Sequence, residues 1–275
     1  MFDFHDVSIF IPVQVENQER MENFDAVMLY FDTYVKNAEI IIIESGPVQR
    51  LQHIQTRDDI IYEFVLNEGP FRKPHLLNHG LRQTTREIVA MHDADTLFKP
   101  EAIDTMVRIF RQYPEVLFGL PHNGVCLDIG GADKARFLAS FDFSIIPYVE
   151  HGELHRDYGN TIVCTSPVAV GGANYYRKDT LLALGGFNES FSSYGWDDFE
   201  LEARFTKMGC PPCTIKDSNV FHLSHERGTD SQQNTKLAKR NEQQFRKIVD
   251  MTREELEQYI AAELAPKCQE AQDQP

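Results

Sequence analysis

The feature that most constrains the fold is a run of four isoleucines, residues 40–43, inside the segment "AEIIIIES" (38–45). A strand with one face in water alternates apolar and polar residues, whereas a strand buried on both faces reads as a continuous apolar run. The "GP" pair at 46–47 then breaks the run. We therefore expect a central strand of a parallel sheet that helices cover on both faces.

Strand and helix patterns alternate along the first 115 residues. Short β-branched runs predict strands, and apolar residues at helical spacing predict amphipathic helices. The expected strands span 6–13, 38–45, 58–66 and 87–95, and the expected helices span 21–36, 74–85 and 100–114. This order predicts an α/β fold with a mostly parallel central sheet flanked by helices, whose ligands bind beyond the carboxyl ends of the strands.

The second half is less regular. Residues 116–124 read as a strand and a loop, residues 125–170 are too mixed to assign, and a helix is expected from Asp197 to Gly209. The chain turns polar and helical after residue 228, and Thr252 with Glu255 forms a capping-box signature. We expect this tail to serve packing or assembly into an oligomer rather than chemistry.

Charge and composition exclude several classes of protein. The 275 residues carry a net charge of −15, so no basic surface is expected to bind nucleic acid, and a bound anion would need a local cation. No apolar run approaches the ~18 residues that a transmembrane segment needs, and the N-terminus does not resemble a signal peptide. We expect a cytoplasmic protein, with peripheral contact to the inner face of the membrane as an alternative.

The five cysteines are scattered, which fits a reducing compartment. "CPPC" at 210–213 has the spacing of a metal or redox motif, but it holds two prolines and has no second cysteine pair nearby. We interpret it as a loop.

The segment "EIVAMHDADTLF" (87–98) ends a predicted strand with Asp93 and Asp95. Aspartates at a strand end often form a solvated turn for local hydrogen-bonding reasons. Side chains two apart in an extended chain also share a face, so this pair could aim two carboxylates at one divalent cation. The three-residue motif alone does not decide between the two interpretations.

A second acidic pair opens the helix expected at 197–209, in "YGWDDFELEARF". Acids in a first turn complement the helix dipole, at ~0.3–1 kcal/mol each. That explains Asp197 and Asp198 but not the neighbouring Trp196. A helix N-terminus would also keep Asp198 ionised, which suits a general base.

Two histidines lie three residues apart in "NVFHLSHERG". A single histidine is more often structural than a ligand, but His222 and His225 accompany a candidate aspartate pair. Imidazole together with carboxylates suits Mn²⁺ better than Mg²⁺.

The order of these motifs resembles a GT-A fold glycosyltransferase of family 2, with a second half similar to the galactosyltransferase and chondroitin-polymerase type. The resemblance covers roughly residues 5–230. It lies in "VSIFIPV", "NEGPFRKPHLLNHGLRQ", "MHDADTLF", "HLSHER" and the 39 residues from Gly171 to Gly209. It implies one GT-A domain over 1–230, with a Rossmann-like nucleotide-sugar half (1–115), an acceptor half (116–230) and a helical tail (231–275).

The resemblance also implies roles for individual residues. Asp95 matches the surer ligand of Mn²⁺ (or Mg²⁺), and Asp93 shares the site or faces the ribose. His225 matches the metal-binding histidine, with His222 as the alternative. Asp198 matches the base that deprotonates the acceptor, Asp197 would hold the acceptor, and Trp196 and Gly172 would line the pocket. Pro12, Val13, Glu44, Lys73 and Asn78 match positions that contact the nucleotide or its diphosphate.

Two departures from the family pattern concern the acceptor and the uridine. The family usually shows Trp-Gly-Gly-Glu-Asp, whereas this chain has no glycine between Trp196 and its acids, a departure that concerns the acceptor geometry. Glu44 stands where an aspartate is more frequent.

The expected reaction transfers a sugar from a UDP-sugar to a hydroxyl of a saccharide or lipid-linked glycan acceptor, with inversion. A retaining transferase of the same fold stays open as an alternative. A nucleotidyltransferase is disfavoured because "VQVENQERMENF" after the first strand contains no glycine. A metallohydrolase or a non-catalytic binding protein fits the combined motifs less well.

Overall fold

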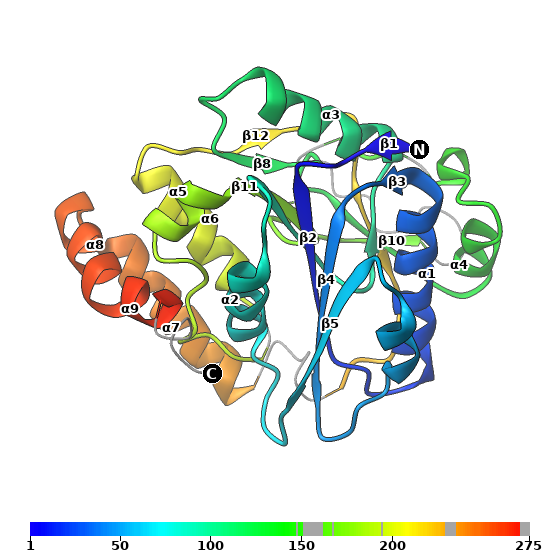
Figure 1. The fold of residues 1–275 in the computed structure, drawn as a ribbon, viewed down its shortest axis with the longest axis horizontal. Coiled ribbons are helices and arrows are strands. Elements are labelled where there is room, and N and C mark those ends of the chain that lie inside the picture. Colours follow the sequence, from blue (N-terminus) through cyan, green and yellow to red (C-terminus); the bar gives the residue numbers. More distant parts are fainter. Residues whose placement is uncertain (147, 151–161, 167, 194, 229–234, 270–275) are drawn as a thin grey trace.

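The computed structural model describes residues 1–146, 148–150, 162–166, 168–193, 195–228 and 235–269. Its centre is a seven-stranded sheet in the order β12-β8-β11-β6-β2-β4-β5 (Figure 1). The strands of this sheet are β2 (Val7–Val13), β4 (Glu39–Gly46), β5 (Ile60–Leu66), β6 (Ile88–His92), β8 (Phe118–Leu120), β11 (Ala173–Arg177) and β12 (Cys213–Thr214). Only β11 runs antiparallel to its neighbours, so the expected mostly parallel α/β sheet is confirmed.

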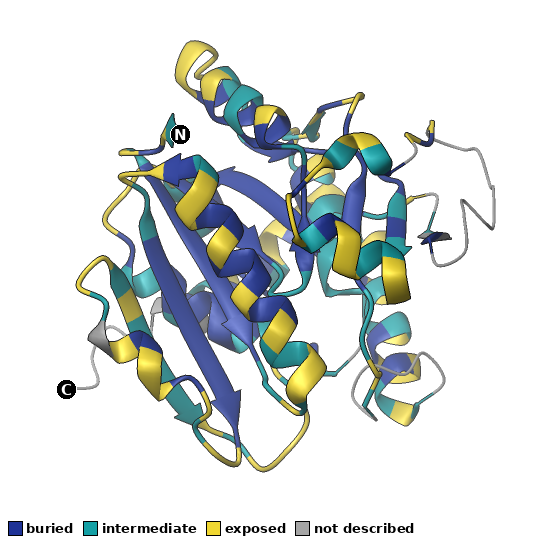
Figure 2. Cartoon of the chain, turned by 90° about the vertical axis from the view of Figure 1, so that its right-hand side faces the viewer, coloured by how far each residue is buried: buried dark blue, intermediate teal, exposed yellow. Residues whose placement is uncertain are grey.

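The isoleucine run of β4 fills two hydrophobic cores at once. Ile40 and Ile42 point into one core, and Ile41 and Ile43 point into the other. The neighbouring β2 behaves in the same way, because successive side chains of a strand face opposite sides of the sheet. Figure 2 shows the central strands as buried along most of their length.

Helices cover each face of this sheet. The first core includes side chains of α1 (Gln18–Tyr34) and α3 (Pro100–Gln112), and the second includes side chains of α2 (Lys73–Gln83), α5 (Lys178–Ala183) and α6 (Asp197–Lys207). The helices begin and end within about three residues of the expected positions. The shift at α1 has a local cause, because the Asn17 side chain accepts a hydrogen bond from the amide of Arg20 at 2.9 Å and caps the helix three residues early.

The segment 125–170, which sequence patterns left unassigned, contributes to a second, four-stranded sheet in the order β10-β9-β13-β7. These strands are β7 (Thr96–Leu97), β9 (Cys126–Ile129), β10 (Ile162–Ser166) and β13 (Val220–Leu223), with α4 (Gly131–Leu138) and η2 (Phe143–Ile145) between β9 and β10. Residues 151–161 of that segment lie outside the described residues. The remaining short elements are β1 (Phe2–Asp3), β3 (Val35–Lys36), which pairs with β1, and η1 (Gln52–Thr56).

The helical tail packs onto the second core. It comprises α7 (Lys236–Asp250), α8 (Arg253–Tyr259), a π-helical turn (Ile260–Leu264) and α9 (Ala265–Gln269), and lies beside α5, α6 and α2 (Figure 1). The capping box of Thr252 and Glu255 is confirmed. Within the described residues, no helix has the length and apolar character of a membrane span.

The loop interpretation of "CPPC" holds only in part. Cys213 begins the two-residue strand β12 at the edge of the sheet, which the flanking prolines did not suggest. Neither cysteine of the motif joins a candidate metal cluster among the described residues.

A buried ion pair fastens α6 to the chain before it. Glu200 and Arg204, four residues apart, are 1% and 0% exposed, and the guanidinium Nε lies 2.9 Å from the carboxylate. Arg204 also donates hydrogen bonds to the carbonyl groups of Leu184 and Gly186. Removing one partner of such a pair leaves a buried charge without its counterion.

We expect Arg204→Ala to lower the free energy of unfolding by about 3–5 kcal/mol. The matched control is Arg246→Ala, which breaks an exposed Glu242–Arg246 pair of the same spacing and should cost less than about 0.5 kcal/mol. Urea unfolding measures both. Equal losses in the two variants would contradict the role given to burial.

Candidate active site

The turn that contains Asp93 and Asp95 is held by one carbonyl group. Strand β6 ends at His92, and the Gly172 carbonyl accepts hydrogen bonds from the Asp93 amide at 2.8 Å and from the Thr96 hydroxyl at 2.9 Å. Gly172 has φ +97°, and a Cβ there would lie 2.9 Å from Val220 Cγ1. Only glycine satisfies both conditions, so Gly172 supports the aspartate turn directly.

Strand pairing brings both histidines to Asp95. In the pairing of β13 with β7, His222 lies opposite Thr96, one residue after Asp95. The Asp95 Oδ2 atom lies 3.1 Å from His225 Nε2 and 3.7 Å from His222 Nε2. One ligand atom from each of the three residues lies within 4.8 Å of the others, a grouping that suits a metal ion. Among the described residues this is the only such group, and Asp93 is outside it.

The hydrogen bonds of the two rings fit a cation at this point. His225 Nδ1 lies 2.8 Å from the Glu226 carbonyl, which can only accept, so Nδ1 carries the hydrogen. His222 Nδ1 is held by the Asp128 carboxylate. In the neutral rings both Nε2 lone pairs then face a carboxylate oxygen, an arrangement that a divalent cation would stabilise. Outer carboxylate and carbonyl partners of this kind orient metal-bound histidines.

The surrounding charges keep Asp95 ionised. Burial raises its pKa, but His222, His225 and Arg20 outweigh burial and hold the pKa well below its usual range. Burial lowers the pKa of His222, but Asp95 and Asp128 outweigh it and raise the value to about 9. In the absence of a metal ion the His222 ring is therefore protonated at neutral pH, and a metal ion bound there would displace that proton.

Lys73 joins the aspartate turn to the acidic pair of α6. Its Nζ atom lies 2.9 Å from Asp93 Oδ1 and 3.3 Å from Asp198 Oδ2. In an extended chain the Asp93 and Asp95 carboxylates would point to the same place. In the structure they point to different partners. The chain turns at residues 94–95 and directs Asp93 to Lys73 and Asp95 to the histidines.

Burial makes Asp198 a stronger base than the helix dipole alone would allow. Desolvation raises its pKa to about 7, with Asp197 and Asp93 acting in the same direction and Lys73 acting against them. Burial also raises the pKa of Asp197. The prediction that the helix N-terminus keeps Asp198 ionised did not include this desolvation. A pKa near neutrality suits a general base.

Gly171 makes room for the Asp198 carboxylate. A Cβ at residue 171 would lie 2.4 Å from Asp198 Oδ2, closer than real Cβ contacts allow. The "GG" pair thus has two separate uses: the first glycine admits the carboxylate of Asp198, and the second supports the aspartate turn.

Trp196 packs against the C-terminal tail. It caps α6 with a left-handed backbone (φ 76°), and its ring stacks on Phe245 of α7 at 4.9 Å between centroids. The amide of Asn241, also on α7, donates to the carbonyl groups of Ser192 and Gly195 at 2.8 and 3.2 Å. The tail therefore shapes the loop that leads into the acidic pair.

Among the residues expected at the nucleotide, Pro12, Val13 and Glu44 lie at the carboxyl ends of β2 and β4, whereas Asn78 lies within α2. Pro12 and Val13 end β2, and Val13 pairs with Glu44. The Glu44 carboxylate is buried and accepts hydrogen bonds from the amides of Arg50 and Leu51 and from Tyr62, so it organises the loop after β4. The Asn78 amide is buried and bonded to Phe187 and Glu189, which ties α2 to the segment before α6.

Sequence reasoning missed four residues of this region: Arg20, Asp128, Asn241 and Phe245. Asp128 lies in the segment that had no assigned pattern, and the two tail residues lie far from the motifs in sequence. Only the helical spacing of the tail could have indicated that α7 has a buried side.

The fold is of the GT-A type found in glycosyltransferases. The profile described as glycosyl transferase family 2 matches residues 8–185. The chain belongs to this family and is a glycosyltransferase.

Similar proteins agree with this class. An amylovoran biosynthesis glycosyltransferase, AmsE of Erwinia amylovora, is 22% identical over 211 residues, which cover 74% of this chain and 72% of the relative. A mannosyltransferase of Pyrobaculum calidifontis, solved with GDP-Man and Mn²⁺, superposes with a TM-score of 0.52 at 18% identity, covering 97% of this chain and 73% of that one. The S. aureus protein TarS superposes with a TM-score of 0.53 at 12% identity, covering 95% of this chain and 43% of TarS. At these identities the structural matches show the fold alone.

Trp196 is the only tryptophan of the chain, so its fluorescence reports on the tail contact. We expect Phe245→Ala to shift the emission maximum to longer wavelength and to cost about 1–3 kcal/mol of stability, because a stacked ring and its buried area are lost. Phe245→Tyr keeps the ring and should leave the emission near that of the wild type. An unchanged spectrum in Phe245→Ala would show that the tail does not shield the indole.

Proposed function

We propose that the protein transfers a sugar from a UDP-sugar to a hydroxyl of a saccharide or lipid-linked glycan, with a divalent metal ion and with inversion at the anomeric carbon. The observation that carries this proposal is the position of Lys73. Its ammonium contacts Asp93 of the aspartate turn and Asp198 of α6, so the expected donor and acceptor sides meet at one cation.

The metal ion would be held by Asp95, His222 and His225, with Asp128 orienting His222. When bound, such an ion neutralises negative charge on a diphosphate leaving group. Mn²⁺ suits the mixed carboxylate and imidazole set, with Mg²⁺ as the alternative. The Mn²⁺ in the like-folded mannosyltransferase complex supports a metal in this fold.

Lys73 would supply a second positive charge to the diphosphate. It is 15% exposed and flanked by three carboxylates that lower the energy of its charged form, Asp198, Asp93 and Asp197. The carboxylates of Asp93 and Asp198 on either side of it also define where the donor and the acceptor would approach. The choice of uridine as the base of the donor nucleotide rests on the family resemblance. The like-folded mannosyltransferase complex contains a guanosine nucleotide, GDP-Man, and so does not bear on this choice.

Asp198 would act as the general base. As the acceptor oxygen bonds to the anomeric carbon, its proton passes to the Asp198 carboxylate, and the bond from that carbon to the diphosphate oxygen breaks with its electron pair leaving on UDP. This single displacement inverts the anomeric centre and needs no carboxylate nucleophile. Asp197 and Trp196 would position the acceptor beside the base.

AmsE is an amylovoran biosynthesis glycosyltransferase, and a related role in polysaccharide synthesis supports a saccharide acceptor. A retaining transferase would not need a base at Asp198, so the stereochemistry of the product separates the two mechanisms.

Two variants separate metal binding from chemistry. We expect Asp95→Asn to lose Mn²⁺-dependent UDP binding in isothermal titration. Asp198→Asn should bind UDP as the wild type does but transfer sugar about 10²–10⁴-fold more slowly, because only the base is lost. Asp58→Asn, in the exposed turn before β5, is the control and should change neither UDP binding nor the rate of transfer. UDP binding that is equally strong with and without Mn²⁺ would refute the metal site.

The pH profile tests the base. Asp198 with a pKa near 7 must be deprotonated to accept a proton, so kcat/KM at saturating Mn²⁺ should rise with pH and level off above about pH 7–8. Lys73 lowers this pKa, so Lys73→Met should move the inflection to higher pH, besides slowing the reaction. A profile that is flat between about pH 5 and 8 would argue against Asp198 as the base.

A further inference from the structure

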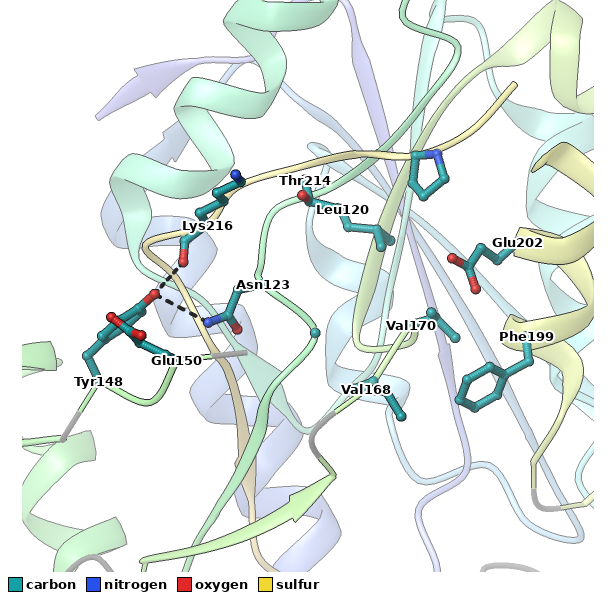
Figure 3. Close-up of a pocket in the computed structure, with 13 residues that line it drawn as sticks. Leu120, Asn123, Tyr148, Glu150, Val168, Val170, Phe199, Glu202, Thr214 and Lys216 are labelled. Carbon is teal, nitrogen blue, oxygen red and sulfur yellow. Dashed lines mark hydrogen bonds between the residues drawn. The ribbon is translucent and has the colours of Figure 1, made fainter. Parts of the chain in front are cut away.

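A cavity of about 750 Å³ opens on the acceptor half, away from the metal-ligand group. It lies where β8 and β12 end, at Leu120 and Thr214, and one wall is formed by Phe199 and Glu202 of α6 (Figure 3). Tyr148 stands at the opposite side (Figure 3). The volume falls within the range of about 300–1,000 Å³ that is typical of small-molecule sites and is more than a single sugar ring fills.

The cavity adjoins the proposed base through both chain segments that meet there. Val170 lines it and precedes Gly171, which lies directly against the Asp198 carboxylate. Phe199 lines it and follows Asp198 on α6. The wall of the cavity therefore continues directly into the two chain segments that hold the Asp198 carboxylate, the group that would deprotonate an acceptor hydroxyl.

The lining suits the sugars of a glycan rather than a phosphate. Phe199 and Tyr148 offer aromatic faces, on which the C–H groups of a sugar ring pack, and Asn123 and Glu202 offer hydrogen-bonding groups beside them. Glu202 and Glu150 bring two carboxylates, and Lys216 is the only cation among the described residues of the lining. A phosphate or diphosphate would meet net repulsion here.

Part of this lining is already held in place. The Tyr148 hydroxyl donates to the Lys216 carbonyl at 2.6 Å, and its ring lies under the Lys99 ammonium at 5.6 Å (Figure 3 shows the hydrogen bond). Asn123 and Asn219 both donate to the Val149 carbonyl, at 2.9 and 2.8 Å. The Tyr148 side of the cavity is therefore ordered before any ligand arrives, which reduces the entropic cost of binding.

We propose that this cavity binds the sugar units of the acceptor that lie beyond the one being glycosylated. The acceptor is accordingly a saccharide of at least two units, neutral or cationic, and the protein contacts its sugars at this point rather than a lipid phosphate. The inference rests on the proposed function, because it takes Asp198 as the base, but the cavity can be tested without turnover.

The test is binding to an array of immobilised mono- to tetrasaccharides, some of them phosphorylated, with UDP and Mn²⁺ present. Val168 lines the cavity and is 52% exposed, so Val168→Trp should place an indole in the cavity with little strain on the core. Leu29→Trp, 54% exposed on α1, is the matched control. Isothermal titration of UDP with Mn²⁺ is run on all three proteins.

The wild type and Leu29→Trp should bind glycans of two or more unphosphorylated sugars. Val168→Trp should bind these glycans at least tenfold more weakly while still binding UDP. The inference is overturned if the wild type retains no such glycan, if Val168→Trp retains them equally well, or if phosphorylated or single sugars bind best. Failure of the proposed donor site has a separate signature, the absence of Mn²⁺-dependent UDP binding in the wild type.

Discussion

The burial of both faces of the central strands is the constraint on which the rest of the structure depends. Strands β2 and β4 place alternate side chains into two hydrophobic cores, so along their length no position is left for chemistry. Polar groups can collect only where the strands end. The aspartate turn follows β6, Glu44 lies at the end of β4, and α6 begins beside them. The side chains proposed for catalysis therefore meet beyond the carboxyl ends of the central strands.

At these strand ends the protein concentrates several carboxylates around few cationic side chains. Asp93, Asp197 and Asp198 surround Lys73, and Asp95 and Asp128 surround His222. Burial alone would protonate such carboxylates, and the neighbouring cations decide which stay ionised. Asp95, beside two histidines and Arg20, has a strongly lowered pKa, whereas Asp198 keeps a raised one. Two aspartates of one site are thereby suited to different tasks, holding a cation and accepting a proton.

The tail is more than a terminal extension of the domain. Its apolar residues Ile248, Leu256, Ile260 and Leu264 belong to the same core as α5 and α6. Phe245 supports the left-handed Trp196, and Asn241 holds the carbonyl groups of the loop before it. Ser193, Gly195 and Trp196 of this loop all have positive φ angles, and the tail contacts help to offset the strain at the non-glycine Trp196.

The sequence by itself determined the α/β class, the order of the central elements and the identity of the acidic and histidine motifs, because apolar periodicity and helix caps are local properties. It also indicated the family, through the order of those motifs. Only the tertiary structure decided that Asp93 and Asp95 face different partners, since the chain turns between them where an extended strand had been expected. It alone placed β13 beside β7, which brings two histidines to a carboxylate about 130 residues earlier. Contacts between segments that are distant in sequence also produce the raised pKa of Asp198, the support from Phe245 and the cavity beside α6. How much water such contacts exclude cannot be inferred from a local sequence pattern.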